Sequence, residues 1–349
     1  MSSKLKVGLI GYGYWGPNYA RVFSESPDST VTAICDGQPE RLARATARFP
    51  EIALCGDVEE LLRRSDVDAV IVSTPASTHF ELARRALASG RHVLVEKPLA
   101  TEVEHCEQLA ELAEKQQRVL MVAHTFLYNA GIRKLHECVK ADGFGHVHYM
   151  HSTRTNLGPI RHDVNAIWDL APHDISIFNY LLGQQPLWAS AIGSRVLRNE
   201  REDVGFITLG YPDSVLANIH VSWADPNKVR EVVVVGSGQR IVFDDMDDLE
   251  RVRIFEKGIS VGETDAESFG EFKLLIRDGD IVSPRIPFSE PLRNQIADFI
   301  ESVSKGRKPL SDAATGTSVV QTLKAIDASI REQGRAVEVA KCRVASRSN

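Results

Sequence analysis

Three side chains have the types and spacing that proton transfer to or from an alcohol would need. Lys97 stands in HVLVEKPLA (92–100), a strand-like run that a proline should end, which leaves its amine able to donate to a hydroxyl or carbonyl oxygen. Asp169 and His173 are four residues apart in NAIWDLAPHDISIFNYLLG (165–183), so on a helix they share one face. A neutral histidine, with a pKa of about 6.5, is a natural proton acceptor at neutral pH.

Each of these residues also has a simpler interpretation. Glu96 and Lys97 can form a surface ion pair between neighbours. Asp169 can cap a helix on which His173 faces solvent. These residues alone leave both interpretations open.

A glycine pattern near the start of the chain predicts a cofactor site. In GLIGYGYWGPNYARVF (8–23), Gly11, Gly13 and Gly16 are spaced G-x-G-x-x-G between a strand-like and a helix-like run. The first glycine permits a tight turn, the second lets the backbone approach a pyrophosphate, and the third lets helix and strand pack closely. The free N–H groups and the positive dipole end of the helix then face the phosphates. The alternative is a purely structural turn.

An acidic residue lies at the distance that a dinucleotide site requires. Asp36 ends the second strand-like run, about 20 residues beyond Gly16. Its carboxylate can accept hydrogen bonds from the ribose hydroxyls of NAD and would repel the 2′-phosphate of NADP. Arg41 keeps NADP open, because a guanidinium can bind that phosphate. We therefore predict a dinucleotide site in which NAD is favoured over NADP.

Further residues complete the predicted site. The predicted cofactor-binding residues are Gly11, Gly13, Tyr14, Trp15, Gly16, Asp36, Arg41, Thr74, Pro75, His79, Glu96 and Lys97. The predicted substrate contacts, each with a structural role as the alternative, are His124, Tyr128, Arg154 and Asn156. No metal is predicted, because the sequence has no H-E-x-x-H motif or Cys/His cluster, and His146, His148 and His162 fit solvated positions.

The elements that must position these residues alternate regularly over residues 1–123. Short apolar runs such as KLKVGLI, DAVIVST and HVLVEK are typical of parallel strands buried on both faces, and helical segments separate them. This order predicts a doubly wound, NAD-binding Rossmann domain. Residues 124–349 contain helical segments at 130–140 and 168–182, then many strand-like runs with tight turns, and a closing helix pair. They predict a second, substrate-binding domain on an antiparallel sheet.

The composition excludes several functions. The 349 residues are 43% hydrophobic and 25% charged, with a net charge of −6, which indicates no general affinity for nucleic acid or anionic membranes. No apolar run approaches the roughly 18 residues of a membrane span. No signal peptide is visible, and five scattered cysteines show no zinc spacing, so we expect reduced thiols in a cytoplasmic protein.

Taken in order, GLIGYGYWGPN, TPASTH, VLVEKPLA and the DLAPH helix resemble the Gfo/Idh/MocA family of NAD(P)-dependent oxidoreductases. The resemblance spans nearly the whole chain. It implies a Rossmann domain plus a domain on an open, mainly antiparallel sheet, whose exposed face makes homodimers or homotetramers. It also implies that Lys97, Asp169 and His173 form the catalytic set, because they match the family motifs E-K-P and D-x-G-x-H. Ala171 stands where glycine is usual, a difference that bears on the local backbone geometry but not on the side-chain roles.

Within the family, the chain resembles a subgroup that acts at C3 of nucleotide-linked amino sugars. The stretches HTFLYN, TRTNLG and WDLAPHDIS carry this likeness, but antibiotic-sugar 3-ketoreductases and inositol or free-sugar dehydrogenases share the framework. The resemblance implies hydride transfer between NAD and a sugar hydroxyl, with His173 moving the proton and Lys97 hydrogen-bonding the oxygen. Asp169 would orient His173 or bind a neighbouring hydroxyl. A protein that binds NAD without turnover is the alternative from another class.

Overall fold

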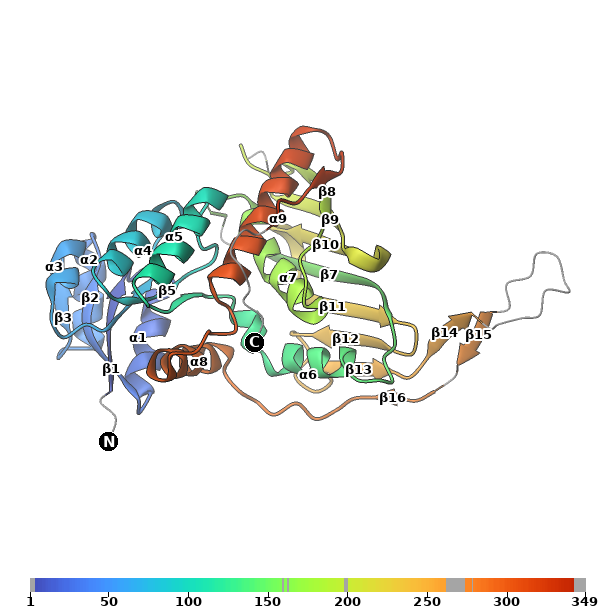
Figure 1. Cartoon of the computed structure of the whole chain (residues 1–349), viewed down its shortest axis with the longest axis horizontal. Coiled ribbons are helices and arrows are strands. Elements are labelled where there is room, and N and C mark those ends of the chain that lie inside the picture. Colours follow the sequence, from blue (N-terminus) through green and yellow to red (C-terminus); the bar gives the residue numbers. More distant parts are fainter. Residues whose placement is uncertain are drawn as a thin grey trace, which may run out of the picture. The chain divides into compact units, whose positions relative to one another are not determined.

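The computed structural model describes residues 4–158, 160–161, 163–197, 200–261, 274–277 and 279–341. By its internal contacts the chain divides into two compact units, whose elements are labelled in Figure 1. The described residues of the first unit lie in 4–128, 289–324 and 341, and those of the second lie in 129–288 and 325–340.

The first unit is built on a six-stranded sheet in which every neighbouring pair is parallel, in the order β3-β2-β1-β4-β5-β6. Its strands are β1 (Leu5–Ile10), β2 (Ser29–Cys35), β3 (Ala53–Cys55), β4 (Ala69–Val72), β5 (His92–Val95) and β6 (Leu120–Val122). Its helices are α1 (Gly16–Glu25), α2 (Pro39–Arg48), α3 (Val58–Arg63), α4 (His79–Ala88), α5 (Val103–Lys115) and α8 (Pro291–Lys305), with short 3₁₀ turns η1 (Ala76–Thr78) and η2 (Thr125–Tyr128). The order reverses between β1 and β4, and right-handed crossovers then put α1 and α4 on opposite faces of the sheet.

The apolar strands of this sheet form the core of the first unit. Val7, Leu9, Ile71 and Val93 are buried, as expected for strands covered on both faces. The switch in strand order places the turns after β1 and β4 side by side at the carboxyl edge, where open α/β sheets bind ligands.

The second unit is built on a nine-stranded sheet in the order β16-β13-β12-β11-β7-β10-β9-β8-β17. Its strands are β7 (Val147–Leu157), β8 (Trp188–Ser194), β9 (Val204–Gly210), β10 (Leu216–Ser222), β11 (Ala224–Gly236), β12 (Arg240–Asp244), β13 (Val252–Phe255), β16 (Ile281–Val282) and β17 (Val337–Glu338). A separate hairpin pairs β14 (Gly258–Val261) with β15 (Leu274–Arg277), and η3 (Pro212–Ser214) joins β9 to β10. Among these described strands β7 and β10 pair in parallel, and the other neighbours are antiparallel.

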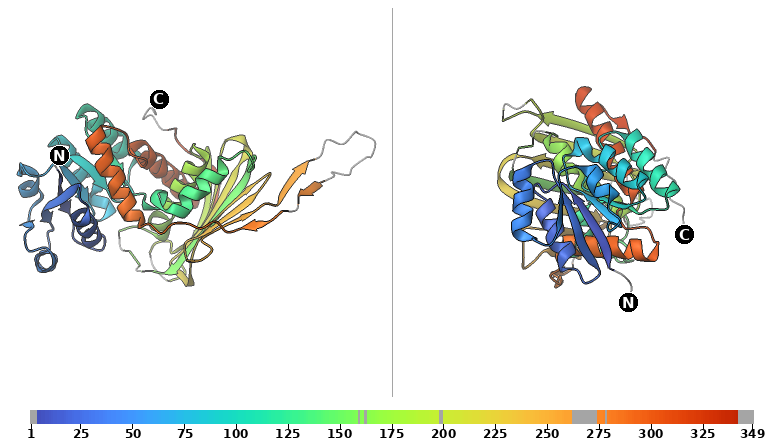
Figure 2. Two further views of the ribbon diagram at one scale, coloured as in Figure 1. Left: turned by 90° about the horizontal axis from the view of Figure 1, so that it is seen from below. Right: turned by 90° about the vertical axis from the view of Figure 1, so that its left-hand side faces the viewer.

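Helices α6 (Ala130–Val139) and α7 (Ala166–Leu182) cover one face of this sheet (Figure 2). α7 is largely apolar and buries Ile175, Phe178 and Leu181, so packing holds the helix that carries Asp169 and His173. α9 (Ala313–Arg331) begins in the first unit and ends in the second.

The structure confirms the predicted fold class, a Rossmann-type parallel sheet followed by a mainly antiparallel one. It adds β3 and α3, which sequence reasoning missed because a three-residue strand and a six-residue helix are too short to show a period. The predicted domains are single stretches, whereas each compact unit includes a returning C-terminal segment. In the first unit this segment is anchored on α1 by ion pairs of Arg21 with Glu290 and of Arg293 with Glu25.

No helix within the described ranges is both long and apolar enough to cross a membrane. The same residues contain no group of three or more His, Cys, Asp or Glu side chains that could hold a metal ion. His162 lies outside the described residues.

Candidate active site

The three glycines of the first turn are required for three different physical reasons. Gly11 has a φ of +96°, and an added Cβ would lie 2.8 Å from the carbonyl oxygen of Ser73. A Cβ on Gly16 would collide with the carbonyl oxygen of Gly11, so glycine lets helix α1 start close to the strand. A Cβ on Gly13 would meet nothing nearer than the Arg41 guanidinium at 3.8 Å. The first and third glycines are therefore demanded by the fold, and the second faces open space that a ligand could fill.

Asp36 holds this turn from the end of β2. Its buried carboxylate accepts hydrogen bonds from the backbone N–H groups of Tyr12, at 2.7 Å, and Gln38, at 2.9 Å. Arg41 lies 3.4 Å from the same oxygen that Tyr12 reaches. A carboxylate can accept about four hydrogen bonds, so Asp36 keeps capacity for ribose hydroxyls while Arg41 balances its charge.

Two aromatic residues project from the turn. Tyr14 is 82% exposed, and its ring meets that of Trp15 edge to face, with centroids 5.8 Å apart. Pro17 occupies the first turn of α1, where its missing N–H costs no intrahelical bond. Because both rings are exposed, Tyr14 and Trp15 can contact a ligand bound at the turn.

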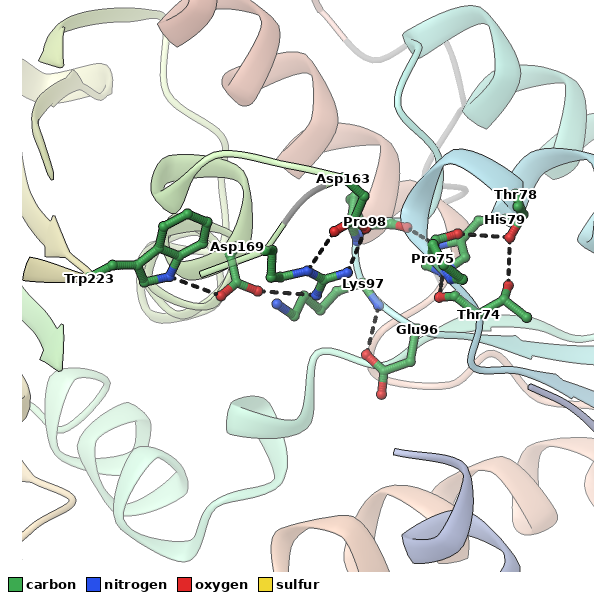
Figure 3. A network of polar contacts seen from close by, with 11 residues as sticks. Thr74, Pro75, Thr78, His79, Glu96, Lys97, Pro98, Asp163, Asp169 and Trp223 are labelled. Atoms are coloured by element: carbon green, nitrogen blue, oxygen red, sulfur yellow. Dashed lines mark hydrogen bonds and ion pairs between the residues drawn. The ribbon is translucent and has the colours of Figure 1, made fainter. Parts of the chain in front are cut away.

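The turn after β4 is braced by His79 (Figure 3). The imidazole is 1% exposed, with Nδ1 2.7 Å from the carbonyl oxygen of Pro98 and Nε2 2.9 Å from that of Thr74. The hydroxyls of Thr74 and Thr78 lie 2.7 Å apart. The predicted cofactor residue His79 therefore directs both ring nitrogens at backbone carbonyls, and ties the Thr74–Pro75 turn to the segment that holds Lys97.

Glu96 and Lys97 follow β5 directly and are buried, each only 9% exposed, so they are not a surface pair. The hydroxyl of Tyr19 donates to Glu96 Oε1 at 2.7 Å. The backbone N–H of Lys97 reaches Glu96 Oε2 at 3.2 Å (Figure 3). Burial and the neighbouring Glu96 charge hold the pKa of the Tyr19 hydroxyl well above its usual value. The Lys97–Pro98 peptide bond is cis. Lys97 thus sits at the carboxyl end of β5, next to the edge strand β6, and its backbone N–H is held by Glu96.

Two predicted substrate contacts lie just beyond β6. His124 is fully buried, and both of its ring nitrogens lack a hydrogen-bond partner within the described chain. Burial, together with the charge of Lys97, lowers its pKa to about 3, so the ring is neutral at physiological pH. The hydroxyl of Tyr128 donates to Asp298 at 2.6 Å and lies 3.1 Å from Ser311 Oγ. Tyr128 therefore has a structural partner, whereas His124 has unused hydrogen-bonding capacity beside Lys97.

In the second unit, Asp169 lies in the first turn of α7, which Asn165 caps by accepting from the Trp168 N–H at 2.9 Å. One oxygen of Asp169 faces Arg161 Nη1 at 3.3 Å, and the other accepts from the indole N–H of Trp223, also at 3.3 Å (Figure 3). Asp169 is therefore not the helix cap, and its carboxylate is held on both oxygens.

Arg161 is itself bound to Asp163 through two parallel hydrogen bonds of 2.9 and 2.7 Å. Burial lowers the pKa of the Arg161 guanidinium, but the hydrogen bond to Asp163 and the charges of Asp169 and Asp163 outweigh it and leave the pKa raised. His173 follows one turn after Asp169, and its carbonyl oxygen accepts from the Ser176 hydroxyl at 2.8 Å. Asp169 and His173 thus share one helix, as the spacing predicts, in a charged environment.

Arg154 and Asp174 form a buried pair between β7 and α7. Arg154 Nε and Nη2 donate to the two oxygens of Asp174 at 2.8 and 3.0 Å, and both side chains are almost wholly buried. The predicted substrate contact Arg154 thus fixes α7 on the sheet beside His173. The fourth predicted contact, Asn156 on the same strand, has a buried Oδ1 atom without a hydrogen-bond partner in the described structure.

Comparison with known proteins places the chain in a family. A model of an oxidoreductase family with an NAD-binding Rossmann fold matches residues 5–124, and a GFO/IDH/MocA C-terminal domain model matches residues 132–242. Together the two matches span more than half of the chain. The chain belongs to the GFO/IDH/MocA oxidoreductase family.

Relatives within the GFO/IDH/MocA family differ in substrate. The chain is 29% identical over 221 residues to the UDP-N-acetylglucosamine 3-dehydrogenase of Acidithiobacillus ferrooxidans, covering 62% of this chain and 67% of that protein. It is also 29% identical over 224 residues to inositol 2-dehydrogenase 2 of Saccharopolyspora erythraea, covering 62% and 66%. A crystal structure of GenD2 from gentamicin A biosynthesis, in complex with NAD, has a TM-score of 0.82 at 24% identity, covering 98% of each chain. That last likeness shows the fold.

The first unit has features that fit the NAD of the GFO/IDH/MocA family. The open side of Gly13 in the turn before α1 and the remaining acceptor capacity of Asp36 match the requirements of a pyrophosphate and a ribose.

Sequence reasoning missed several residues that hold the predicted ones. Tyr19, Arg161, Asp174 and Trp223 each hydrogen-bond a predicted site residue or its neighbour. The sequence does hold a local signal for Arg161, because a cation a few residues before α7 can pair with Asp169 in the first turn of that helix. Trp223 is 54 residues from Asp169 and gives no local signal.

Proposed function

We propose that this protein transfers hydride between NAD and a ring hydroxyl or ketone of a sugar, with Lys97, Asp169 and His173 as its catalytic residues. The observation that carries the proposal is the burial of Lys97 at the carboxyl end of β5, in a domain whose glycine turn fits a dinucleotide. An amine at this edge of the sheet can donate to a ligand oxygen, because open α/β sheets bind ligands at the carboxyl ends of their strands.

The chain's residues would hold the cofactor at the first turn and manage the proton. The backbone around Gly13 would face the pyrophosphate, and Asp36 would accept from the ribose hydroxyls. Bound NAD would supply the hydride-accepting chemistry. In oxidation His173 would take the hydroxyl proton, and in reduction it would return it. Lys97 would donate a hydrogen bond to the same oxygen and stabilise its developing negative charge. Asp169 would orient His173 or bind a neighbouring hydroxyl.

NAD is proposed over NADP because of Asp36. Its carboxylate lies where the 2′-phosphate of NADP would be repelled, and the nearby Arg41 guanidinium is already paired with it. Calorimetric titration with both cofactors tests this choice, and tighter binding of NADP would reverse it.

The proposed substrate is a nucleotide-linked amino sugar oxidised at C3, supported by the UDP-N-acetylglucosamine 3-dehydrogenase relative. The inositol 2-dehydrogenase relative supports a free cyclitol or sugar at the same level of identity. A panel of UDP-N-acetylglucosamine, its uronate, an aminoglycoside and myo-inositol, followed at 340 nm with NAD, separates these classes. Turnover of the nucleotide sugars alone is the expected result.

The decisive variant removes the Lys97 amine. Lys97→Met should reduce turnover by roughly 10²–10³-fold, because one preorganised donor to the reacting oxygen is lost, while calorimetry should find NAD affinity nearly unchanged. Lys115→Met, an exposed lysine at the end of α5, is the matched control and should keep full turnover. Undiminished turnover in Lys97→Met would refute the catalytic role. A chain that binds NAD but turns over no member of the panel would favour the non-enzymatic alternative.

We also propose that the protein is a homo-oligomer through the uncovered face of the second sheet. Tyr149, Ile192, Phe206 and Leu216 are each about half exposed, and strand register sets them on the face opposite Arg154. Clustered exposed apolar side chains are typical of interaction surfaces. Light scattering should give the mass of a dimer or a tetramer. Phe206→Glu places a charge on the proposed interface and should shift the measured mass toward that of the monomer. A monomeric wild-type chain at micromolar concentration would contradict the proposal.

A further inference from the structure

The carboxylate of Asp169 has an unusual set of donors within the second unit. The Arg161 guanidinium reaches Oδ1 at 3.3 Å from the loop before α7, and the Trp223 indole N–H reaches Oδ2 at 3.3 Å from between β10 and β11 (Figure 3). Trp223 is buried, so its ring is fixed by packing. Asp163 fixes Arg161 in turn by two hydrogen bonds of 2.9 and 2.7 Å. The plane of the Asp169 carboxylate is thus defined from both sides by groups that are themselves held.

The chemistry of these donors favours one protonation state. An indole N–H and a guanidinium can only donate, and an ionised carboxylate can only accept. A proton on Asp169 would remove the negative charge that both donors bind and would leave a weaker acceptor for each of them. The arrangement therefore stabilises the ionised carboxylate and opposes its protonation.

We infer that Arg161 and Trp223 are positioning residues that keep Asp169 ionised and in one orientation. The inference rests on the proposed function for its link to catalysis, because Asp169 acts there with His173. In that reaction the ionised Asp169 cannot serve as the proton donor, so the proton moves through His173.

The other charged groups near the start of α7 have partners of their own. Asp163 is paired with Arg161, and Asp174 with Arg154. Asp327 accepts from the indole N–H of Trp168 at 2.9 and 3.0 Å, and Glu202 accepts from Asn165 at 3.0 Å. His173 is the titratable group one turn along the helix. Loss of the Arg161 charge should therefore act on its two partners, Asp163 and Asp169, and the Trp223 indole reports on Asp169 because it bonds that carboxylate.

The indole N–H of Trp223 is a built-in reporter of this carboxylate. The chain has four tryptophans, so the indole region of a ¹H–¹⁵N spectrum holds at most four resonances, and Trp223→Phe identifies one of them. Trp168, which bonds Asp327 in the same unit, is an internal control. In the wild-type protein the Trp223 resonance should differ from its position in Asp169→Asn, and it should stay constant from pH 7.5 to about 5.

Removing the Arg161 charge should make this resonance titrate. In Arg161→Gln the pKa of Asp169 should rise by roughly one unit or more, so the Trp223 signal moves at higher pH than in wild type while the Trp168 signal does not. Arg161→Lys keeps the charge and should recover most of the wild-type behaviour. Arg195→Gln, which breaks a surface pair with Glu202, is the matched control and should leave both signals unchanged. An unchanged Trp223 resonance in Asp169→Asn, or identical acid responses of wild type and Arg161→Gln, would overturn the inference.

Kinetics with a substrate found in the panel complete the test. Arg161→Gln should lower kcat about tenfold, leave the KM for NAD unchanged, and move the acid limb of the kcat profile to higher pH. If no substrate turns over, the proposed function fails, and the resonance data still decide whether Arg161 and Trp223 hold Asp169. If the wild type turns over and the acid limb of Arg161→Gln does not move, the positioning role alone is refuted.

Discussion

The two units hold their candidate residues by different means. In the first unit, backbone atoms set the geometry. Gly11 and Gly16 have no room for a Cβ. Both ring nitrogens of His79 face backbone carbonyl oxygens, one of which belongs to Pro98, the residue after Lys97. In the second unit, the geometry is set by charged side chains, with Arg161 on Asp169 and Arg154 on Asp174. A backbone-defined site suits a ligand that is largely invariant, such as a dinucleotide, and a side-chain-defined site can change with its substrate.

The glycine turn offers the largest expected effect on the backbone side of this comparison. Gly13→Ala fits the protein but fills the space proposed for the pyrophosphate, so NAD affinity should fall about tenfold or more with an unchanged melting temperature. In Gly16→Ala the added Cβ collides with the Gly11 carbonyl oxygen, so both the NAD affinity and the melting temperature should fall. Calorimetry and thermal unfolding separate the two.

The control for this pair is Gly56→Ala, whose added Cβ would meet nothing within 4 Å. It should change neither property. If Gly13→Ala binds NAD as tightly as Gly56→Ala, the turn is structural and the second glycine has no ligand to face.

The same contrast explains what could be predicted from sequence. The Rossmann order, the glycine turn and the placement of Lys97 after β5 depend on neighbouring residues, and they follow from period and motif. Arg154, the partner of Asp174, lies on β7, 20 residues away in the sequence. Trp223, a partner of Asp169, is 54 residues away. Such pairs depend on strand register, which includes an unexpected parallel pairing of β7 with β10, and no local pattern encodes it.

Predicted substrate contacts illustrate the limit of motif reasoning. A polar residue in a family-like stretch can face a ligand or the protein, and sequence does not distinguish them. Tyr128 turns its hydroxyl to Asp298 and Ser311, and Arg154 is bound to Asp174. His124 and Asn156 retain buried polar atoms without described partners, so they are the better candidates for ligand contact.

The buried ion pair gives the next largest effect, on the side-chain side of the comparison. Arg154→Met leaves the Asp174 charge buried without its bidentate partner, so the free energy of unfolding should fall by about 3–5 kcal/mol in urea denaturation. Arg195→Met breaks an exposed pair with Glu202 and should cost at most about 1 kcal/mol. Equal, small losses in both variants would mean that the buried pair does not anchor α7.

A smaller effect should appear as acid sensitivity of the first unit. The folded-state pKa of His124 is lowered to about 3, by burial and then by the charge of Lys97, so below the ordinary pKa of 6.5 the unfolded chain binds a proton that the folded chain does not. This site should therefore cost about 2 kcal/mol of stability between pH 7.5 and 5. His124→Phe should flatten the fall of unfolding free energy with decreasing pH. If the unfolding free energy of wild type and His124→Phe falls equally steeply with decreasing pH, His124 is not buried as a neutral ring.

The central claim is that Lys97 and His173, one from each unit, act on one alcohol oxygen. A crystal structure of the protein with NADH and a substrate from the panel tests it most directly. The account predicts that Lys97 Nζ and one ring nitrogen of His173 both lie within roughly 3.2 Å of the same substrate oxygen. A complex in which the amine and the imidazole contact different groups, with neither near the hydroxyl that faces the nicotinamide, would contradict it.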